Sequence, residues 1–255
     1  MSLLANKKGL IVGVANANSI AWAIAQEAHK QGAELAFTYL NEALEKRVRP
    51  LAEQLGAPHV LPCDVNDDQQ IAAVCETLKS SWGKLDFLVH AVAFAQREDL
   101  QGRFADTSRE GFRTALEVSA YSLVALSRAV APLMTEGGSI ITLTYYGSQK
   151  VVQNYNVMGV AKAALEASVR YLANDLGPDN IRVNAVSAGP VKTLSAKGIR
   201  GFNDMMSHAA KLAPLQRNVD ASEVGKTAVF LLSDLASGVT GETLYIDAGY
   251  NIKGM

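Results

Sequence analysis

Residues 9–21 read GLIVGVANANSIA, and this stretch decides the fold. An apolar run ends at Gly13, a turn of small residues follows, and a helical pattern begins at Ile20. Backbone N–H groups and the dipole at a helix N-terminus favour a phosphate, and small residues let the backbone approach it. The stretch therefore predicts a strand–turn–helix unit that binds the pyrophosphate of a dinucleotide. Because the turn has only one glycine, a tight turn with Ser19 as helix N-cap is the alternative.

Outside this stretch, apolar runs alternate with longer helical patterns. The runs are continuous, which is typical of parallel strands buried on both faces. Regular β–α alternation predicts an α/β, doubly wound, Rossmann-type fold: a seven-stranded parallel sheet with helices on both faces, in a single domain over residues 1–255. The predicted strands are Gly9–Val14, Leu35–Tyr39, Val60–Pro62, Phe87–Ala91, Ser139–Thr144, Val183–Ser187 and Thr243–Ile246. The predicted helices are Ile20–Gln31, Gln69–Ser81, Arg109–Leu133, Tyr155–Leu176 and Ser222–Leu232.

One segment, at about residues 190–220, interrupts the alternation of strands and helices, between the sixth strand and the last helix. Long insertions in compact domains usually serve as lids or binding loops. Within it, Leu194–Met206 mixes two glycines with basic residues and with apolar residues that have no obvious core face. We therefore expect a mobile substrate lid that orders over cofactor and substrate, and a rigid surface helix is the alternative.

The composition narrows the class of protein. The chain has 255 residues, of which 49% are apolar and 19% charged, and its formal net charge is −1. This balance gives no indication of nucleic acid or membrane as a partner. No signal peptide and no apolar run of membrane-spanning length is expected, so we expect a cytoplasmic protein. Cys63 and Cys75 lack both a CxxC spacing and a histidine cluster, so we expect reduced thiols and no metal site.

The ends of the next three strands bear on the cofactor. Leu40 is neither the acidic residue that holds the ribose 2′-OH of NAD nor the arginine that holds the 2′-phosphate of NADP. Because no base stands there, NADH is favoured over NADPH. Asp64 follows the third strand, where it can contact the adenine or cap the next helix. His90 ends the fourth strand and is expected to be a hydrogen-bonded core residue.

Tyr155 and Lys162 are the candidate chemical pair. They are two helical turns apart, so both side chains project from one face of the helix that follows the fifth strand. A tyrosine is a usable acid only if its pKa of about 10 is tuned, and a nearby ammonium favours the phenolate. A lysine also donates to ribose hydroxyls. Tyr146 and Lys150 are the rival pair, but a glycine and a serine between strand and helix keep them off one helical face.

Three motifs carry a resemblance to a known family. They are Gly13-Val14-Ala15-Asn16 with Ser19-Ile20-Ala21, Asn154-Tyr155-Asn156-Val157-Met158-Gly159 with Lys162, and Ser187-Ala188-Gly189-Pro190 with Thr193-Leu194. With them the chain resembles the bacterial enoyl-[acyl-carrier-protein] reductases of the short-chain dehydrogenase/reductase superfamily, essentially from Gly9 to the C-terminus. The Tyr-x6-Lys spacing is specific, since most short-chain dehydrogenases carry Tyr-x3-Lys with a serine upstream.

The resemblance implies an oxidoreductase that reduces the C2–C3 double bond of trans-2-enoyl-acyl carrier protein thioesters with NADH in fatty acid biosynthesis. It implies catalytic roles for Tyr155 on the enolate oxygen, for Lys162 on the nicotinamide ribose, and for Tyr145 as a second tyrosine. The implied cofactor-binding residues are Gly13, Ser19, Ile20, Asp64, Val65, Ala93, Lys162, Val191 and Thr193. The implied substrate-binding residues are Tyr145, Tyr155, Phe202 and Met205.

The same resemblance implies an enoyl substrate carried by acyl carrier protein or coenzyme A, and a homotetramer built on the helices Arg109–Leu133 and Tyr155–Leu176. The chain departs from the family at the adenosine ribose, where Leu40 replaces a glutamine, and in the lid, where Asn203 and Asp204 replace bases found in some members. Two other functions stay open: a short-chain reductase of another ketone or enone, and a catalytically silent NAD(H)-binding regulator on the same fold.

Overall fold

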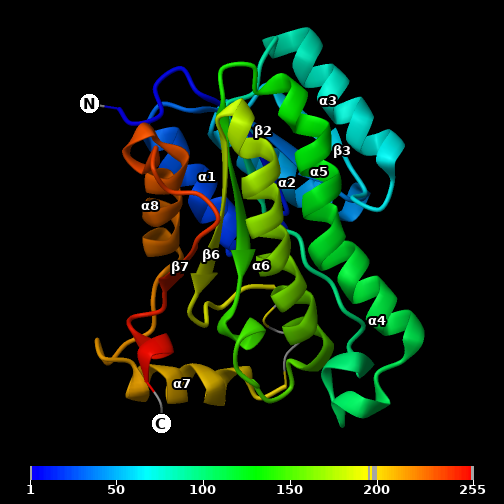
Figure 1. Ribbon diagram of the computed structural model, residues 1–255, viewed down its shortest axis with the longest axis vertical. Coiled ribbons are helices and arrows are strands. Elements are labelled where there is room, and N and C mark those ends of the chain that lie inside the picture. The colour runs from blue at the N-terminus through cyan, green and yellow to red at the C-terminus, as the bar shows by residue number, and fades with distance from the viewer. Residues whose placement is uncertain (1, 195, 197–199, 254–255) are drawn as a thin grey trace.

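The computed structural model describes residues 2–194, 196 and 200–253. Its sheet has seven parallel strands in the order β3-β2-β1-β4-β5-β6-β7 (Figure 1). The order runs outward in both directions from β1 and β4, which confirms the predicted doubly wound α/β fold. The strands are β1 (Lys8–Val12), β2 (Glu34–Tyr39), β3 (His59–Pro62), β4 (Phe87–His90), β5 (Gly138–Thr144), β6 (Ile181–Ala188) and β7 (Thr243–Ile246).

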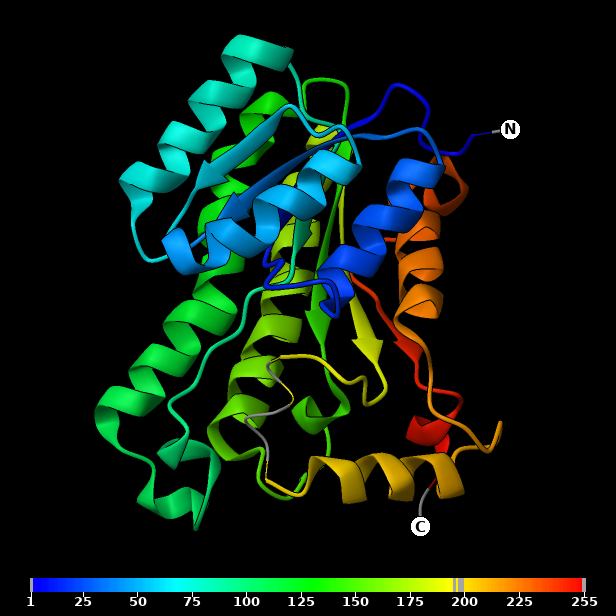
Figure 2. The ribbon, with the colours of Figure 1, turned by 180° about the vertical axis from the view of Figure 1, so that it is seen from behind.

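Helices cover both faces of this sheet. One face carries α1 (Ile20–Lys30), α2 (Glu42–Gln54) and α8 (Ala221–Leu232), as Figure 2 shows. The other face carries α3 (Asp68–Trp82), α4 (Arg109–Leu116), α5 (Ser122–Val130) and α6 (Asn156–Leu176), which lie in front in Figure 1. Helix α7 (Phe202–Leu212) belongs to neither layer and lies beyond the carboxyl ends of the strands.

Two apolar cores fill the spaces between the sheet and its helices. Consecutive strand residues point to opposite faces, so Leu10 packs with α3, α5 and α6, whereas Ile11 packs with α1 and α8. Both side chains are fully buried, which explains why the strands read as continuous apolar runs.

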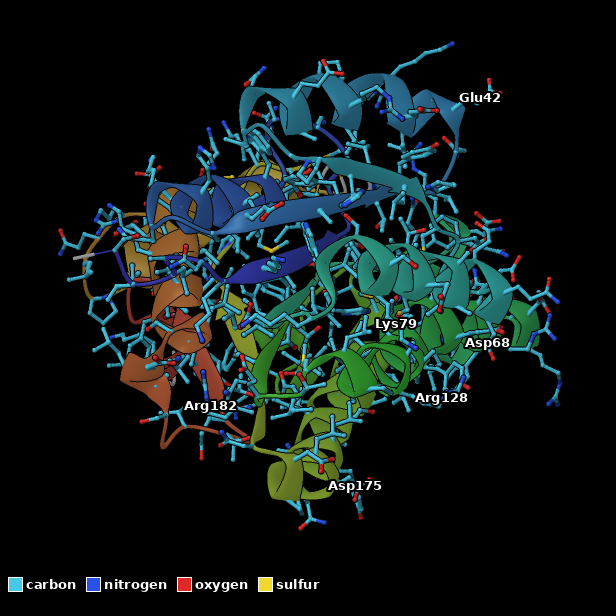
Figure 3. The ribbon with its side chains drawn as sticks, turned by 90° about the horizontal axis from the view of Figure 1, so that it is seen from above. Glu42, Asp68, Lys79, Arg128, Asp175 and Arg182 are labelled. Atoms are coloured by element: carbon cyan, nitrogen blue, oxygen red, sulfur yellow. The ribbon has the colours of Figure 1, made fainter. Side chains whose placement is uncertain are left out.

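At the edge of one layer, Arg128 of α5 forms an ion pair with Asp68 of α3 at 3.2 Å (Figure 3).

Helix α2 is not among the predicted helices, and Pro50 lies inside it. Proline lacks a backbone donor and disfavours the helical conformation of the residue before it. The helix is nevertheless anchored at its start, where Leu44 N donates to the Asn41 side chain at 3.1 Å. Val48 and Ala52 are fully buried against the sheet. Packing and capping therefore outweigh the proline in this helix.

The predicted helix Arg109–Leu133 contains a π-helical segment, Glu117–Tyr121, between α4 and α5. Segments of this kind are rare and occur often at functional sites. By length and composition this stretch could cross a membrane, which corrects the expectation that no apolar run is long enough. Half of its most apolar window is buried, and α5 packs on α3 and α6, as a core helix of an α/β fold does.

His90 is a buried core histidine, as predicted. Its Nδ1 lies 2.8 Å from Thr142 Oγ1, and its Nε2 lies 2.8 Å from Ser122 Oγ. Burial, aided by the charge of Lys162, lowers the pKa of His90 from 6.5 to about 3. The ring is therefore uncharged at neutral pH and serves to join β4, β5 and α5.

We expect this histidine to make the fold less stable in acid. Between pH 6.5 and about 3, the unfolded chain binds a proton at position 90 that the folded chain does not bind. The free energy of unfolding therefore falls as the pH drops through this window, by up to ~1.4 kcal/mol per pH unit from this residue. His90→Gln keeps a donor and an acceptor and should remove that part of the slope. Urea titrations of both proteins across this window measure the difference, and equal slopes would contradict it.

Candidate active site

A mainly apolar cavity of about 390 Å³ lies beyond the carboxyl ends of the strands. Since the strand order reverses between β1 and β4, this is the topological switch point at which open α/β sheets bind ligands. The structure brings several predicted site residues together in its lining: Ile20, Ala93, Tyr145, Tyr155, Val191, Thr193, Phe202 and Met205. The other predicted site residues lie outside this lining: Gly13, Ser19, Asp64, Val65 and Lys162.

Gly13 and Ser19 shape the turn between β1 and α1. Gly13 has a φ of 110°, and a Cβ there would lie 2.3 Å from the carbonyl oxygen of Ala91, so no larger residue fits. Ser19 stands at the N-cap position, but its hydroxyl makes no capping bond to α1. It accepts instead from the N–H groups of Ala15 and Asn16, at 3.0 and 3.1 Å. Trp22 N and Ala23 N donate to the carbonyl oxygen of Ser19, whereas the N–H groups of Ile20 and Ala21 have no partner among the described residues. These two N–H groups are therefore available to a ligand, which suits a pyrophosphate.

Asp64 and Val65 follow β3. The Asp64 carboxylate accepts from the N–H of Asn66 at 2.9 Å, and Val65 is buried. The alternative role of Asp64 as a helix cap is wrong, because the N-cap of α3 is Asp67, which accepts from Gln69 N at 2.9 Å. Asp64 is thus a half-buried carboxylate at the carboxyl end of β3.

Tyr155 occupies the N-cap position of α6 and is 8% exposed. Its ring packs edge to face against the ring of Tyr145, with centroids 5.1 Å apart. Gly147 makes room for it, since a Cβ there would lie 2.6 Å from a ring carbon of Tyr155. Within the described residues, the Tyr155 hydroxyl has no hydrogen-bond partner, although the residue lines the cavity. This hydroxyl is therefore free to bind a ligand.

Burial, and to a lesser degree Tyr145, raises the pKa of Tyr155 above that of a free phenol. The expectation that Lys162 favours the phenolate does not hold, because burial and Tyr145 account for the direction of the pKa shift and Nζ of Lys162 donates to the carbonyl oxygen of Leu143 at 2.7 Å. Tyr155 is therefore a protonated phenol at neutral pH, which makes it a hydrogen-bond donor.

Lys162 lies on α6 and is 6% exposed. Burial lowers its pKa to about 8, while the carboxylate of Glu166, one turn further along α6, opposes this shift. Within the described residues its ammonium makes one hydrogen bond, to Leu143, so two N–H groups remain for a ligand. The rival pair is not supported. Tyr146 donates to the carbonyl oxygen of Asn251 at 3.2 Å, and Lys150 is exposed.

The first turns of α7 close the cavity on the side away from the sheet. Phe202 and Met205 line it, and the Tyr145 hydroxyl lies 3.2 Å from the sulfur of Met205. Both residues are half-buried and face the cavity, and neither belongs to an apolar core cluster of the described residues, in line with the expectation that they have no core face. Lys197 and the other lid positions at 195, 198 and 199 lie outside the described residues.

Ser119 shapes the cavity without a signal in the sequence. It lies in the π-helical segment, where its hydroxyl accepts from Phe94 N at 3.0 Å and donates to Phe94 O at 3.1 Å. This contact fixes the chain just after β4. A serine in an apolar helix does not reveal such a partner. The lining residues without a sequence signal are Phe94, Ala95, Arg97, Leu100 and Ala196.

Known proteins resemble this chain over nearly its whole length. The model of the family described as enoyl-(acyl carrier protein) reductase matches residues 13–251. The enoyl-[acyl-carrier-protein] reductase [NADH] FabI of Rickettsia typhi is 57% identical over 252 residues, which cover 99% of this chain and 97% of that protein. The protein of the same name from Bacillus cereus is 55% identical and is covered over its full length.

Solved structures agree with these sequence matches. The Bacillus cereus enoyl-acyl carrier protein reductase with NADP+ and indole naphthyridinone has a TM-score of 0.98 at 55% identity, with both chains fully covered. The reductase of Anaplasma phagocytophilum in complex with NAD has a TM-score of 0.96 at 52% identity, over 99% of this chain and 97% of that one. This chain therefore belongs to the enoyl-(acyl carrier protein) reductase family, within the short-chain dehydrogenase/reductase superfamily.

Proposed function

We propose that this chain is an NADH-dependent oxidoreductase that reduces the C2–C3 double bond of trans-2-enoyl-acyl carrier protein thioesters in fatty acid biosynthesis. The observation that carries the proposal is the protonated hydroxyl of Tyr155, which has no partner among the described residues and lies at an apolar cavity, at the start of the helix that holds Lys162. Relatives of 55–57% identity that bear this substrate and cofactor in their names support it.

The β1–α1 turn fits the pyrophosphate of NADH, because Gly13 keeps the turn tight and the hydroxyl of Ser19 leaves the first N–H groups of α1 to a ligand. Leu40, exposed after β2, offers no base to a 2′-phosphate, so NADPH is the weaker candidate. When bound, NADH supplies the hydride that adds to C3 of the enoyl thioester. The residues we assign to the cofactor are Gly13, Ser19, Ile20, Asp64, Val65, Ala93, Lys162, Val191 and Thr193.

Tyr155 stabilises the charge that develops on the thioester carbonyl oxygen as C3 is reduced. A phenol whose pKa is raised by burial keeps its proton and donates a hydrogen bond where the negative charge appears. Tyr145 supports the ring of Tyr155 by edge-to-face packing. The two remaining N–H groups of Lys162 hold the nicotinamide ribose. The enolate then takes a proton from water at C2, which completes the reduction.

The substrate lies between the sheet and α7 in this proposal. Phe202 and Met205 contact the acyl chain, since both line the cavity. The carrier, acyl carrier protein or coenzyme A, docks at the mouth, where the bases Lys192 and Arg200 are exposed. Asp204 is exposed at the same end of α7 and reduces the positive charge offered to an acidic carrier.

We infer that the enzyme is a cytoplasmic homotetramer built on α4, α5 and α6. Three large side chains on these elements are exposed: Phe112 of α4, Tyr121 of the π-helical segment and Tyr171 of α6. Exposed apolar side chains of this kind suit contact with a second copy of the chain. Light scattering in solution tests this inference, and a monomer would refute it.

Assays with two thioesters separate the proposed function from its alternatives. An enoyl reductase oxidises NADH with crotonyl-coenzyme A and not with acetoacetyl-coenzyme A. A ketone reductase shows the reverse preference, and a silent regulator binds NADH but oxidises it with neither. Turnover of NADH with the crotonyl thioester alone is the expected result.

We expect α7 to gain protection from hydrogen exchange when NADH and a substrate analogue bind. Phe202 and Met205 would then pack on the ligand and exclude water from the site. Exchange of peptides from Phe202–Leu212, with and without ligands, measures the gain. Peptides from α8 are the control, since Val224 and Ala228 are buried in the core in either state. Equal, strong protection of α7 in both states would instead make it a rigid surface helix.

A further inference from the structure

Glu166 is a buried carboxylate to which the reaction as described assigns no role. It is 6% exposed and lies one turn after Lys162 on α6. Its Oε1 accepts from Thr144 Oγ1 at 2.7 Å and from Ser148 Oγ at 2.5 Å. A buried carboxylate is costly unless hydrogen bonds and a nearby positive charge compensate for the lost water. Here the hydroxyls of Thr144 and Ser148 supply the hydrogen bonds, and Lys162 supplies the positive charge.

The two hydroxyl donors hold the segment that carries Tyr145. Thr144 ends β5, and Ser148 ends the 3-10 turn that follows. Just before them, the carbonyl oxygen of Leu143 accepts from the ammonium of Lys162. Residues 143–148 are therefore bound to α6 at three points, two of them through Glu166. The Tyr145 ring, which packs on Tyr155, is held between these points.

The carboxylate also acts on the charge of Lys162. Burial alone favours the neutral amine and lowers the pKa of Lys162 to about 8, whereas Glu166 raises it. The ammonium does not donate to the carboxylate, so the effect acts through space. Without it, the amine would lose its proton at a lower pH.

Among residues 2–194, 196 and 200–253, few other titratable groups face this pair. His90 of β4 faces Lys162 and is uncharged at neutral pH. Tyr245 of β7 faces Glu166, and burial raises its pKa. Around Tyr245 lie Tyr146 and the buried carboxylate of Asp247. Asp99 is buried, and its Oδ1 accepts from Ser108 N while its Oδ2 has no partner among the described residues. The other charged side chains on elements near α6 are exposed or bound to backbone groups elsewhere: Glu98, Arg109, Glu110, Arg113, Glu117, Arg128 and Arg182.

We propose that Glu166 is a positioning residue: its carboxylate keeps the ammonium of Lys162 charged and holds the segment that carries Tyr145 against α6. The inference rests on the proposed function, because it gives Glu166 an effect on the reduction through Lys162 and Tyr145, with no contact to the substrate. Its electrostatic part concerns NADH binding and is measurable without turnover.

The test is the pH dependence of NADH affinity, measured by fluorescence from neutral to alkaline pH. The affinity should fall as Lys162 loses its proton. Glu166→Gln keeps an acceptor for Thr144 and Ser148 but removes the charge, so the fall should occur about one pH unit lower than in the wild-type protein. Glu166→Asp keeps the charge at a longer distance, so its shift should go in the same direction and be smaller.

Two variants control for effects other than charge at this site. Ser148→Ala removes one hydrogen bond of Glu166 and keeps the carboxylate, so the pH of the fall should not change. Asp175→Asn removes an exposed carboxylate from the far end of α6, so it should also leave the profile unchanged (Figure 3).

Wild-type profiles in both Glu166 variants would overturn the proposal, and so would an equal shift in Ser148→Ala, which would make the effect one of packing. If Glu166→Gln does not fold, Glu166→Asp alone decides, by a shift or its absence. Failure to reduce crotonyl-coenzyme A would refute the proposed function but leave these NADH profiles interpretable. Normal turnover with unshifted profiles would refute the role of Glu166 alone.

Discussion

Tyr155→Phe is expected to lower kcat with crotonyl-coenzyme A by ~10²–10³-fold and to leave NADH affinity nearly unchanged. The substitution removes only a hydroxyl that has no partner within the described residues. The ring that packs on Tyr145 is kept, so the shape of the cavity is retained. The lost hydrogen bond is made only when charge develops on the substrate oxygen, so the loss appears in turnover. Steady-state kinetics and NADH titration measure the two effects separately.

Tyr171→Phe is the matched control for this substitution. Tyr171 lies on the same helix but outside the lining of the cavity, and phenylalanine keeps the ring that we assign to the subunit contact. Losing its hydroxyl should therefore change neither kcat nor NADH affinity. Wild-type turnover in Tyr155→Phe would show that the phenol does not stabilise the reacting oxygen. A large loss of NADH affinity would place the hydroxyl on the cofactor instead.

Lys162→Ala is expected to weaken NADH binding by about tenfold to a hundredfold and to lower kcat as well. Hydrogen bonds from a charged group typically contribute about 1.5–3 kcal/mol, and a buried ammonium with two N–H groups that lack a partner in the described part of the chain can make them to the ribose. The substitution also empties the space beside the carbonyl oxygen of Leu143. NADH titration together with kcat tests both effects.

Lys162→Arg should restore only part of the loss, because a planar guanidinium does not place its charge as a compact ammonium does. Lys150→Ala is the control, since this lysine is exposed in the segment before α6. It should behave as the wild-type protein. NADH affinity that is unchanged in Lys162→Ala would remove the assignment of this lysine to the ribose.

The sheet was predictable from the sequence because each strand is buried on both faces. Residues such as Leu10 and Ile11 point to opposite helical layers, and both layers demand apolar side chains. The pair Tyr155 and Lys162 was likewise visible, since helical periodicity alone places residues seven apart on one face. Helix α2 was less visible because capping by Asn41 and burial of Val48 overcome a local signal from Pro50.

The hydrogen-bond partners of the site were not predictable, because they depend on atomic positions to within about one ångström. Asp64 and Asp67 both follow β3, and only the second reaches the first N–H groups of α3. Ser19 stands where a helix cap should be, yet its hydroxyl turns back to the β1–α1 turn. Glu166 meets hydroxyls 18 and 22 residues earlier in the chain, so its role depends on how β5 packs against α6.

Transfer of deuterium from NADH labelled at both C4 positions to crotonyl-coenzyme A is the measurement that tests the reduction most directly. The proposed site delivers hydride to C3 of the enoyl thioester while Tyr155 binds the carbonyl oxygen. The product should therefore be butyryl-coenzyme A with one deuterium at C3 for each NADH oxidised. Crotonyl-coenzyme A that remains unlabelled and unreduced beside bound NADH would contradict this account, as would deuterium at any carbon other than C3.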